Sequence, residues 1–521
     1  MLLQAEAVSI RNLLPGRRVL GGRRLAEPTR LRVACACPSL QLTEELGQLP
    51  TYESQGAPPL LIMNLHHLLL ALGTTAGLSL GQDHQARMGE PVPGLTAAES
   101  DLFEAGALAF AAGLTIPEGL GPIMNDVSCG ACHNIPALGG WGPNTVIRFG
   151  RSAQAGQPFD TLDLLGGSLL QEQAIDPACA ETIPAQADVT SERLAPICFG
   201  AGLLEAIPEA AIAQNEAVQS SLGLAGYRRM FTPLEGGPAG ASRFGWKGGP
   251  STVMSFSIDA ANMEMGLTSV FMPNDQAPNG DLAQLALCDN VADPEDAPDA
   301  QGYTRVDRIT HFQAMLAAPP QTPRSGTMGE AVFAAAGCAD CHTPTYTTGP
   351  HAIGALSGVE IHPYSDFLIH DMGSGGDGIA DGPVSETQHL TRALWGLSLR
   401  TSMMHDGSIT GGSFDQLVHN AILAHGGEAA ASQASYLALS PADQGALRKF
   451  LRSLGQAEFD LSDDDHDVDE FDWFFCYQQF NGPVPAAPHG PDSVGALCDL
   501  DQDGDFDLVE FGAFQRAFTG Q

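Results

Sequence analysis

The chain has 521 residues, of which 61 are acidic and 24 are basic, and its formal net charge at pH 7 is −37. A field of this sign repels nucleic acids and anionic membrane surfaces, so we expect neither as a partner. It favours cations such as calcium and basic partner proteins. The length allows two or three domains, and the 60 glycines and 36 prolines predict long ordered loops between helices.

The first 81 residues read as an upstream extension followed by a targeting segment. Residues 1–62 show no coherent hydrophobic periodicity, and we interpret them as disordered or as wrongly included ahead of a start at Met63. The apolar run in 63–81 is too short for a comfortable membrane span and ends in small residues, which is typical of a secretory signal cleaved after Gly81. A long arginine-bearing leader and a buried helix are the alternatives.

The signal segment predicts an exported protein, periplasmic or beyond. Since no other stretch approaches about 18 unbroken apolar residues, we expect no membrane span after cleavage. The first helix that we expect starts after Thr96, a possible cap with Glu99 three residues later, and runs through Phe110.

A short motif then appears twice, and it carries the strongest chemical signal in the chain. It reads Cys129-Gly-Ala-Cys132-His133 in the first copy and Cys338-Ala-Asp-Cys341-His342 in the second. In this pattern the two thiols add to the vinyl groups of a porphyrin, and the adjacent histidine becomes the proximal ligand of the iron. The sequence therefore predicts two covalently bound haems c, with His133 and His342 as iron ligands.

Three other interpretations compete: a redox dithiol, a structural zinc site and buried structural cysteines. A redox dithiol does not need a histidine after both cysteine pairs, and buried structural cysteines need no fixed spacing, whereas the two clusters could in principle supply the four ligands of a zinc site. Export agrees with haem attachment, which takes place outside the cytoplasm. Of the seven other cysteines, Cys179 with Cys198 and Cys476 with Cys498 are plausible disulfides in an oxidising compartment.

The first haem region, residues 96–320, offers no nearby second axial histidine, because none occurs between His133 and His311. The simplest inference is an open or weakly held iron face, which suits ligand or peroxide chemistry better than electron carriage alone. The alternative is a methionine ligand: Met230, Met254 or Met263.

Three segments of this region, Arg193–Glu209, Arg243–Lys247 and Phe256–Gly266, resemble signatures of the di-haem oxidoreductase (peroxidase) family, also labelled thiol oxidoreductase. The resemblance covers about 96–457 and extends to bacterial di-haem cytochrome c peroxidases and MauG-type enzymes. It implies that the first haem is peroxidatic and that a distal glutamate assists O–O cleavage. Glu205 is the first candidate for that acid–base role and Glu209 the second; a surface or helix-capping glutamate is the alternative.

In the second haem region, residues 321–457, a short helix from Gly329 leads into Cys338, and a terminal helix begins at Ser440-Pro441 and reaches about Leu454. The resemblance places the distal ligand of the second haem after Met404-His405-Asp-Gly407. His425 occupies that place, where the relatives have methionine or tyrosine, and two histidine ligands would lower the haem potential.

Alternative ligands of the second iron are Met372, Met403 and Met404. We interpret His370 and His405 as propionate partners or loop residues.

The acidic tail, residues 458–521, contains a twelve-residue loop of the EF-hand type. Its calcium ligands would be Asp499, Asp501, Asp503, Asp505, Asp507 and Glu510. A degraded copy, expected to bind calcium weakly or not at all, offers Asp463, Asp465, Asp467, Asp469 and Asp472. The pair resembles dockerin-like repeats, which implies an anchoring or docking appendage; interleaved aromatic residues argue against a disordered tail.

Together these features predict a mainly α protein with two cytochrome-c-like haem domains, long loops and a small EF-hand pair. The expected function is an exported oxidoreductase, peroxidase-like, that takes a peroxide or another small oxidant and exchanges electrons with a carrier protein. The alternative is a non-enzymatic electron-transfer cytochrome in which both irons are six-coordinate.

Overall fold

The computed structural model describes residues 86–289, 291, 293–321, 327–457, 459–460, 468–478, 498 and 508–518. The chain divides after Thr75, and all of the described residues belong to the unit Ala76–Gln521. The predicted upstream extension, 1–62, and signal segment, 63–81, lie outside them. No described helix is long and apolar enough to span a membrane.

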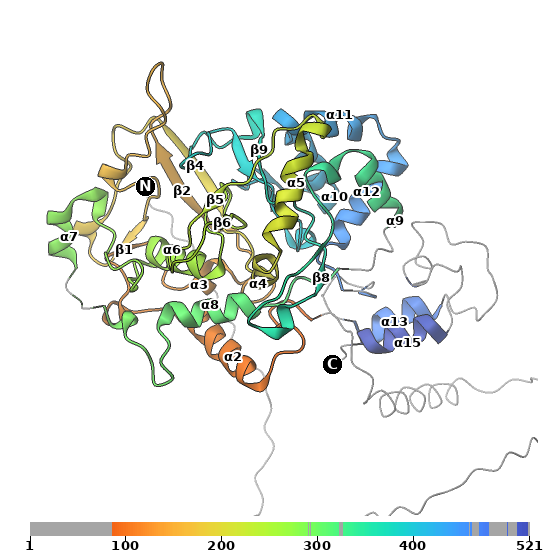
Figure 1. Ribbon diagram of the computed structural model, residues 1–521, viewed down its shortest axis with the longest axis horizontal. Coiled ribbons are helices and arrows are strands. Elements are labelled where there is room, and N and C mark those ends of the chain that lie inside the picture. Colours follow the sequence, from red (N-terminus) through yellow and green to blue (C-terminus); the bar gives the residue numbers. More distant parts are fainter. Residues whose placement is uncertain are drawn as a thin grey trace, which may run out of the picture. The chain divides into compact units, whose positions relative to one another are not determined.

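The described part is mostly helical, as the sequence predicted, and it also contains small two-stranded sheets that were not predicted (Figure 1). Its α-helices are α2 (Ala97–Ala111), α3 (Cys129–Cys132), α4 (Ala201–Glu205), α5 (Glu209–Leu222), α6 (Val253–Met265), α7 (Leu282–Cys288), α8 (Arg305–Met315), α9 (Thr327–Ala335), α10 (Phe414–Ala424), α11 (Ala430–Ala438), α12 (Pro441–Ser453), α13 (Glu470–Tyr477) and α15 (Leu508–Ala517).

The strands form antiparallel pairs. These are β1 (Ile123–Met124) with β3 (Gln173–Ala174), β2 (Thr145–Gly150) with β4 (Val189–Leu194), β5 (Met230–Phe231) with β6 (Gly240–Ala241), β7 (Tyr346–Thr347) with β8 (Glu360–Ile361), β9 (Ile369–Asp371) with β10 (Gln388–Leu390), and β11 (Ser402–Met403) with β12 (Ile409–Thr410).

The first hydrophobic core forms where α2 packs against α8 (Figure 1). Thr96 caps α2, and Glu99 completes a capping box, which confirms the predicted start of this helix. The ring of Phe312 lies 5.2 Å from that of Phe103 and 4.9 Å from that of Phe110. Cys129 packs against this core, so the first attachment motif is anchored on it.

The second core forms between α9 and α12, where the rings of Phe333 and Phe450 lie 5.4 Å apart. Ser440 caps α12 and Pro441 takes its first position, as predicted, because proline lacks the N–H that would be unpaired there. Cys338 packs against this core. Each attachment motif thus has its own hydrophobic core.

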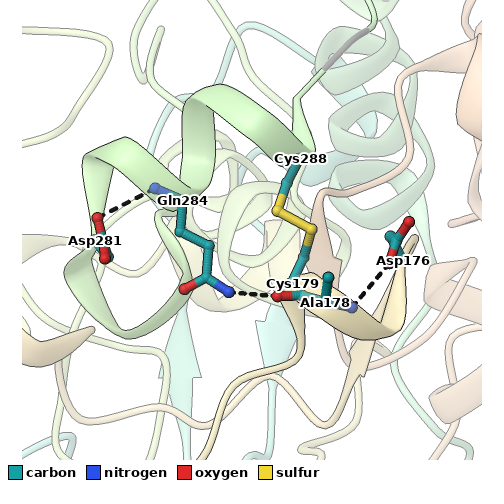
Figure 2. The surroundings of a disulfide bond; sticks show 6 residues. All are labelled: Asp176, Ala178, Cys179, Asp281, Gln284 and Cys288. Carbon is teal, nitrogen blue, oxygen red and sulfur yellow. Dashed lines mark hydrogen bonds between the residues drawn. A yellow bond between two sulfur atoms is a disulfide. The ribbon is translucent and has the colours of Figure 1, made fainter.

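The predicted pairing of Cys179 with Cys198 is wrong. Cys179 instead forms a disulfide with Cys288, 109 residues away, which ties the turn after β3 to the end of α7 (Figure 2). Hydrogen bonds reinforce this junction, since the side chain of Gln284 bonds the carbonyl of Ala178. Cys198 is a buried free thiol.

The second predicted disulfide, Cys476–Cys498, is confirmed. It belongs to a small cluster with α13 and α15, in which Trp473 contacts Phe511 and Phe514 at ring distances of 5.2 and 5.0 Å. Among the predicted calcium ligands, Asp469 caps α13, and Asp472 and Glu510 are buried. The other predicted ligands, 463, 465, 467 and 499–507, lie outside the described residues.

A buried cluster of charges joins residues far apart in the chain. Asp377 accepts hydrogen bonds from Arg193 at 2.9 and 2.6 Å and forms an ion pair with Lys247 at 2.8 Å. Burial alone would raise the pKa of Asp377, but these two cations lower it to about 2. The carboxylate therefore links β4 and the loop after β6 to the chain that leads into β10.

Asp377→Asn should lower the free energy of unfolding by about 3 kcal/mol, because it leaves two buried cations without their counterion. Since the folded pKa of Asp377 is depressed, its contribution is present above the ordinary value of 3.8 and is lost as the pH falls towards 2. Urea titrations between pH 7 and pH 2 measure both effects. Asp381→Asn, which removes a carboxylate that is 47% exposed in its pair with Arg229, should cost less than about 1 kcal/mol; equal losses would contradict this account.

Candidate haem centres

The first attachment motif is a single helical turn that places its histidine at the helix end. Ser128 caps α3 by accepting a hydrogen bond from the Ala131 N–H at 3.1 Å. His133 Nδ1 lies 3.2 Å from the carbonyl oxygen of Gly140. A carbonyl can only accept, so Nδ1 carries the proton, and Nε2 keeps the lone pair that an iron needs.

Gly140 and Gly142 lie so close to the backbone of the motif region that a side chain would not fit at either position. A Cβ at Gly140 would lie 2.0 Å from the carbonyl oxygen of Ile135, and one at Gly142 would lie 2.4 Å from that of Cys132. The glycine-rich turn after the motif therefore folds back closely over it.

The second motif repeats this arrangement in a different local structure. Cys338–Asp340 form a short 3-10 turn, and His342 Nδ1 lies 2.9 Å from the carbonyl oxygen of Tyr364. Both motif histidines keep some accessible surface, yet protein surrounds them, and this burial lowers the pKa of His133 and of His342 to about 4. Both imidazoles are therefore neutral at pH 7, the state in which histidine binds a metal.

The residues around the first motif include groups that fit the propionate edge of a haem. The Nε1–H of Trp141 is buried and has no hydrogen-bond partner among the residues that the structure describes, and Arg400 lies over the same indole, 5.7 Å from the ring centroid. Arg392 is close to Arg400, and burial lowers the pKa of each guanidinium to about 10. Among the described residues no carboxylate forms an ion pair with either arginine. The carboxylates of haem propionates would satisfy both cations and the indole N–H.

A glutamate, Glu264, lies beside the first motif. Asn125 donates a 2.7 Å hydrogen bond to Glu264 on α6, and the charge of Glu264 contributes to raising the pKa of both Cys129 and Cys132. Burial raises the pKa of Glu264 itself.

Asp259, also on α6, has its pKa raised mainly by burial. Arg148 on β2 lowers the pKa of both carboxyls, yet it forms no close ion pair with either among the described residues, and its buried Nε has no partner. Sequence patterns do not single out Glu264, because its place beside Cys129 depends on the packing of α6 against β1. The only sequence signal was its position inside the segment Phe256–Gly266.

The two glutamates chosen from the sequence both hold elements together. Glu205, at the end of α4, accepts a 2.5 Å hydrogen bond from the Val253 N–H at the start of α6, and burial raises its pKa. Glu209 pairs with Arg243 at 2.9 Å and accepts from the Ala241 N–H. The helix-capping alternative thus describes the contacts of Glu205, and a catalytic role for either stays a prediction.

The methionines considered for the first iron are spread over several elements. Met230 is half-exposed on β5, and Met254 Sδ accepts a hydrogen bond from Thr310 at 3.2 Å. Met263 is the neighbour of Glu264 on α6.

A cavity of about 420 Å³ lies at the end of α10 and contains the ligand predicted for the second iron. Met404, His405 and His425 all line it. His425 Nδ1 lies 2.7 Å from the carbonyl oxygen of Ala421, so its Nε2 is free to bind a metal. The charge of His425 contributes to lowering the pKa of His342, which means that the two imidazoles lie near one another.

The other histidines of this region make their own contacts. His405 stacks on His389 with ring centroids 4.5 Å apart, and His370 lies buried between two carboxylates. Met403 is buried in the second core.

Residues 184–454, more than half of the chain, match the family model described as "Di-haem oxidoreductase, putative peroxidase". This protein belongs to that family. Membership implies two haems and a peroxide as the substrate class, in agreement with the paired motifs. No curated protein matches the chain.

Among solved structures, hydrazine synthase of Kuenenia stuttgartiensis, pressurised with xenon, aligns over 80% of this chain and 100% of that one, with 13% identity and a TM-score of 0.31. A MauG-like protein associated with microbial copper homeostasis aligns over 72% and 94%, with 14% identity and a TM-score of 0.32.

Replacing Arg392 and Arg400 together by glutamine should lower the reduction potential of the first haem, because removing positive charge disfavours the form with the extra electron. Spectroelectrochemical titration of both haems measures this, and the second haem should shift less. Arg151→Gln, which breaks an exposed ion pair with Asp160, is the control. A first-haem potential that matches the control would show that the two guanidiniums lie away from the haem.

Proposed function

We propose that this protein is an exported di-haem peroxidase, in which the first haem takes the peroxide and the second passes electrons to it from a carrier. The observation that carries the proposal is the difference between the two centres. The charge of His425 acts on His342, whereas Glu264 acts on both cysteines of the first motif and has Asp259 and Arg148 as its own charged neighbours.

Cys129, Cys132 and His133 would hold the first haem, and Cys338, Cys341 and His342 the second, with His425 as its sixth ligand. When bound, the first haem supplies an iron that binds peroxide and delivers electrons to it. The overall reaction consumes one hydrogen peroxide, two protons and two electrons and forms two waters.

Glu264 is the acid–base group that this arrangement favours. It would take the proton from the near oxygen of peroxide and return it to the leaving oxygen, a transfer that requires a carboxyl with a raised pKa. Arg148 would stabilise the negative charge that develops as the O–O bond breaks, since its buried Nε has no hydrogen-bond partner in the described part of the chain. Glu205 and Glu209 remain candidates from the family resemblance.

The electron donor that we expect is a basic carrier protein, because a chain with a net charge of −37 attracts cationic partners. Two disulfides, Cys179–Cys288 and Cys476–Cys498, support an oxidising location outside the cytoplasm. We further propose that Asp499–Glu510 binds calcium and that the C-terminal helix pair serves as an appendage for anchoring or docking.

A second function, electron transfer without catalysis, requires a sixth ligand on the first iron. Met230, Met254 and Met263 are the candidates that the sequence offers for it. A methionine ligand there would close the face that peroxide needs.

Glu264→Gln should lower the rate of peroxide consumption by about 100-fold or more, because the amide cannot exchange the proton. Stopped-flow mixing of the reduced holoprotein with hydrogen peroxide measures this rate for each variant at equal haem content. Glu205→Gln should mainly lower the melting temperature, because it weakens the contact between α4 and α6.

Glu192→Gln on β4, where the carboxylate bonds only Thr145 among the described residues, is the control. Loss of turnover in Glu205→Gln with full turnover in Glu264→Gln would reverse the assignment. Full turnover in both would remove the acid–base role from this pocket.

A further inference from the structure

His370 on β9 is held between two carboxylates in the second haem region. Its side chain is 4% exposed, with Nε2 2.9 Å from Asp366 Oδ2 and Nδ1 3.2 Å from Glu428 Oε2. A carboxylate at each nitrogen requires a proton on both, so the ring is an imidazolium. Burial by itself lowers the pKa of His370, but the hydrogen bond to Asp366 raises it.

Glu428 belongs to the loop that carries the predicted iron ligand. It follows His425 by three residues, and its carboxylate also accepts hydrogen bonds from the backbone N–H groups of Asp371 at 3.0 Å and Ala225 at 2.8 Å. The loop packs directly on the chain after β9: a Cβ at Gly427 would lie 2.1 Å from the Asp371 carbonyl oxygen, and the φ of Gly427 is +54°. Only glycine allows this approach.

Asp366 connects the same histidine to the attachment motif. The Asp366 N–H donates to the carbonyl of Cys341 at 2.8 Å, and Cys341 Sγ lies 3.9 Å from His370 Nδ1. His370 therefore contacts the motif that holds the proximal ligand and, through Glu428, the loop that holds the distal one.

This cluster could also be interpreted as a metal site, because the ligand atoms of Cys341, Asp366 and His370 lie within 4.8 Å of one another. Two contacts argue against it. Both nitrogens of His370 are already hydrogen-bonded, and Cys341 is committed to the haem thioether. The cluster therefore has no free ligand atom on His370 or Cys341 to offer a metal ion.

We propose that Glu428, acting through His370 and Asp366, is the positioning residue that holds His425 against the second haem. The proposal rests on the function proposed above, in which His425 is the sixth ligand of that iron. The two carboxylates and the imidazolium fix the distance between the attachment motif and the loop. Without Glu428 the loop loses its contacts to His370, Asp371 and Ala225, and His425 is no longer directed at the iron.

Glu428→Gln tests this in the holoprotein, and the electron paramagnetic resonance spectrum of the ferric state is the readout. The variant should shift the ratio of bound to released His425 by about tenfold, because hydrogen bonds to charged groups are lost. The bis-histidine low-spin signal should fall and a high-spin signal should rise. His370→Gln should do the same, and the double variant should add little, since both residues act through one contact.

Glu360→Gln is the matched control, because Glu360 also faces a histidine, His362, but at 3.6 Å and with a side chain that is 65% exposed. Its spectrum should equal that of the wild type. Glu428→Asp, which keeps the charge on a shorter side chain, should retain part of the low-spin signal and serves if the glutamine variant fails to fold.

Two negative outcomes are distinguishable. A wild-type protein with no bis-histidine signal would overturn both the ligand assignment and the positioning role. A wild-type bis-histidine signal that Glu428→Gln preserves as fully as Glu360→Gln does would overturn the positioning role alone.

Discussion

The hydrogen bond from Nδ1 of each motif histidine to a backbone carbonyl is the contact on which the two centres depend. Gly140 supplies the acceptor for His133, and Tyr364 supplies it for His342. Each bond fixes the tautomer and the direction of the ring, and each leaves Nε2 available. The folds around these bonds differ, since one motif is an α-helical turn and the other a 3-10 turn.

The two centres share this hydrogen bond but differ in the charged groups around them and in the iron ligands that they offer. The first is surrounded by groups that an anion or a reacting peroxide could use, including Arg392, Arg400 and Glu264. The second has a histidine, His425, in the cavity at the end of α10 and a buried cluster that reaches from its motif to that histidine's loop. This difference between the two centres is what a protein with one reactive haem and one electron-transferring haem would require.

Local sequence signals predicted local structure well. The capping box at Thr96 and the Ser440-Pro441 start both appear as expected, because they involve residues within one turn. Each attachment motif could be predicted from its own five residues. The disulfide Cys179–Cys288 was missed because it spans 109 residues, and nothing in the spacing of the cysteines favours that partner. Glu264 and Glu428 were missed for the same reason: their contacts, to Asn125 and His370, depend on packing between distant segments.

The central claim is that one iron has an open face and the other does not. The electron paramagnetic resonance spectrum of the ferric wild-type protein, recorded with and without peroxide, tests it most directly. The account predicts one high-spin haem that changes on adding peroxide and one low-spin haem with two histidine ligands. Two low-spin signals that peroxide leaves unchanged would contradict it.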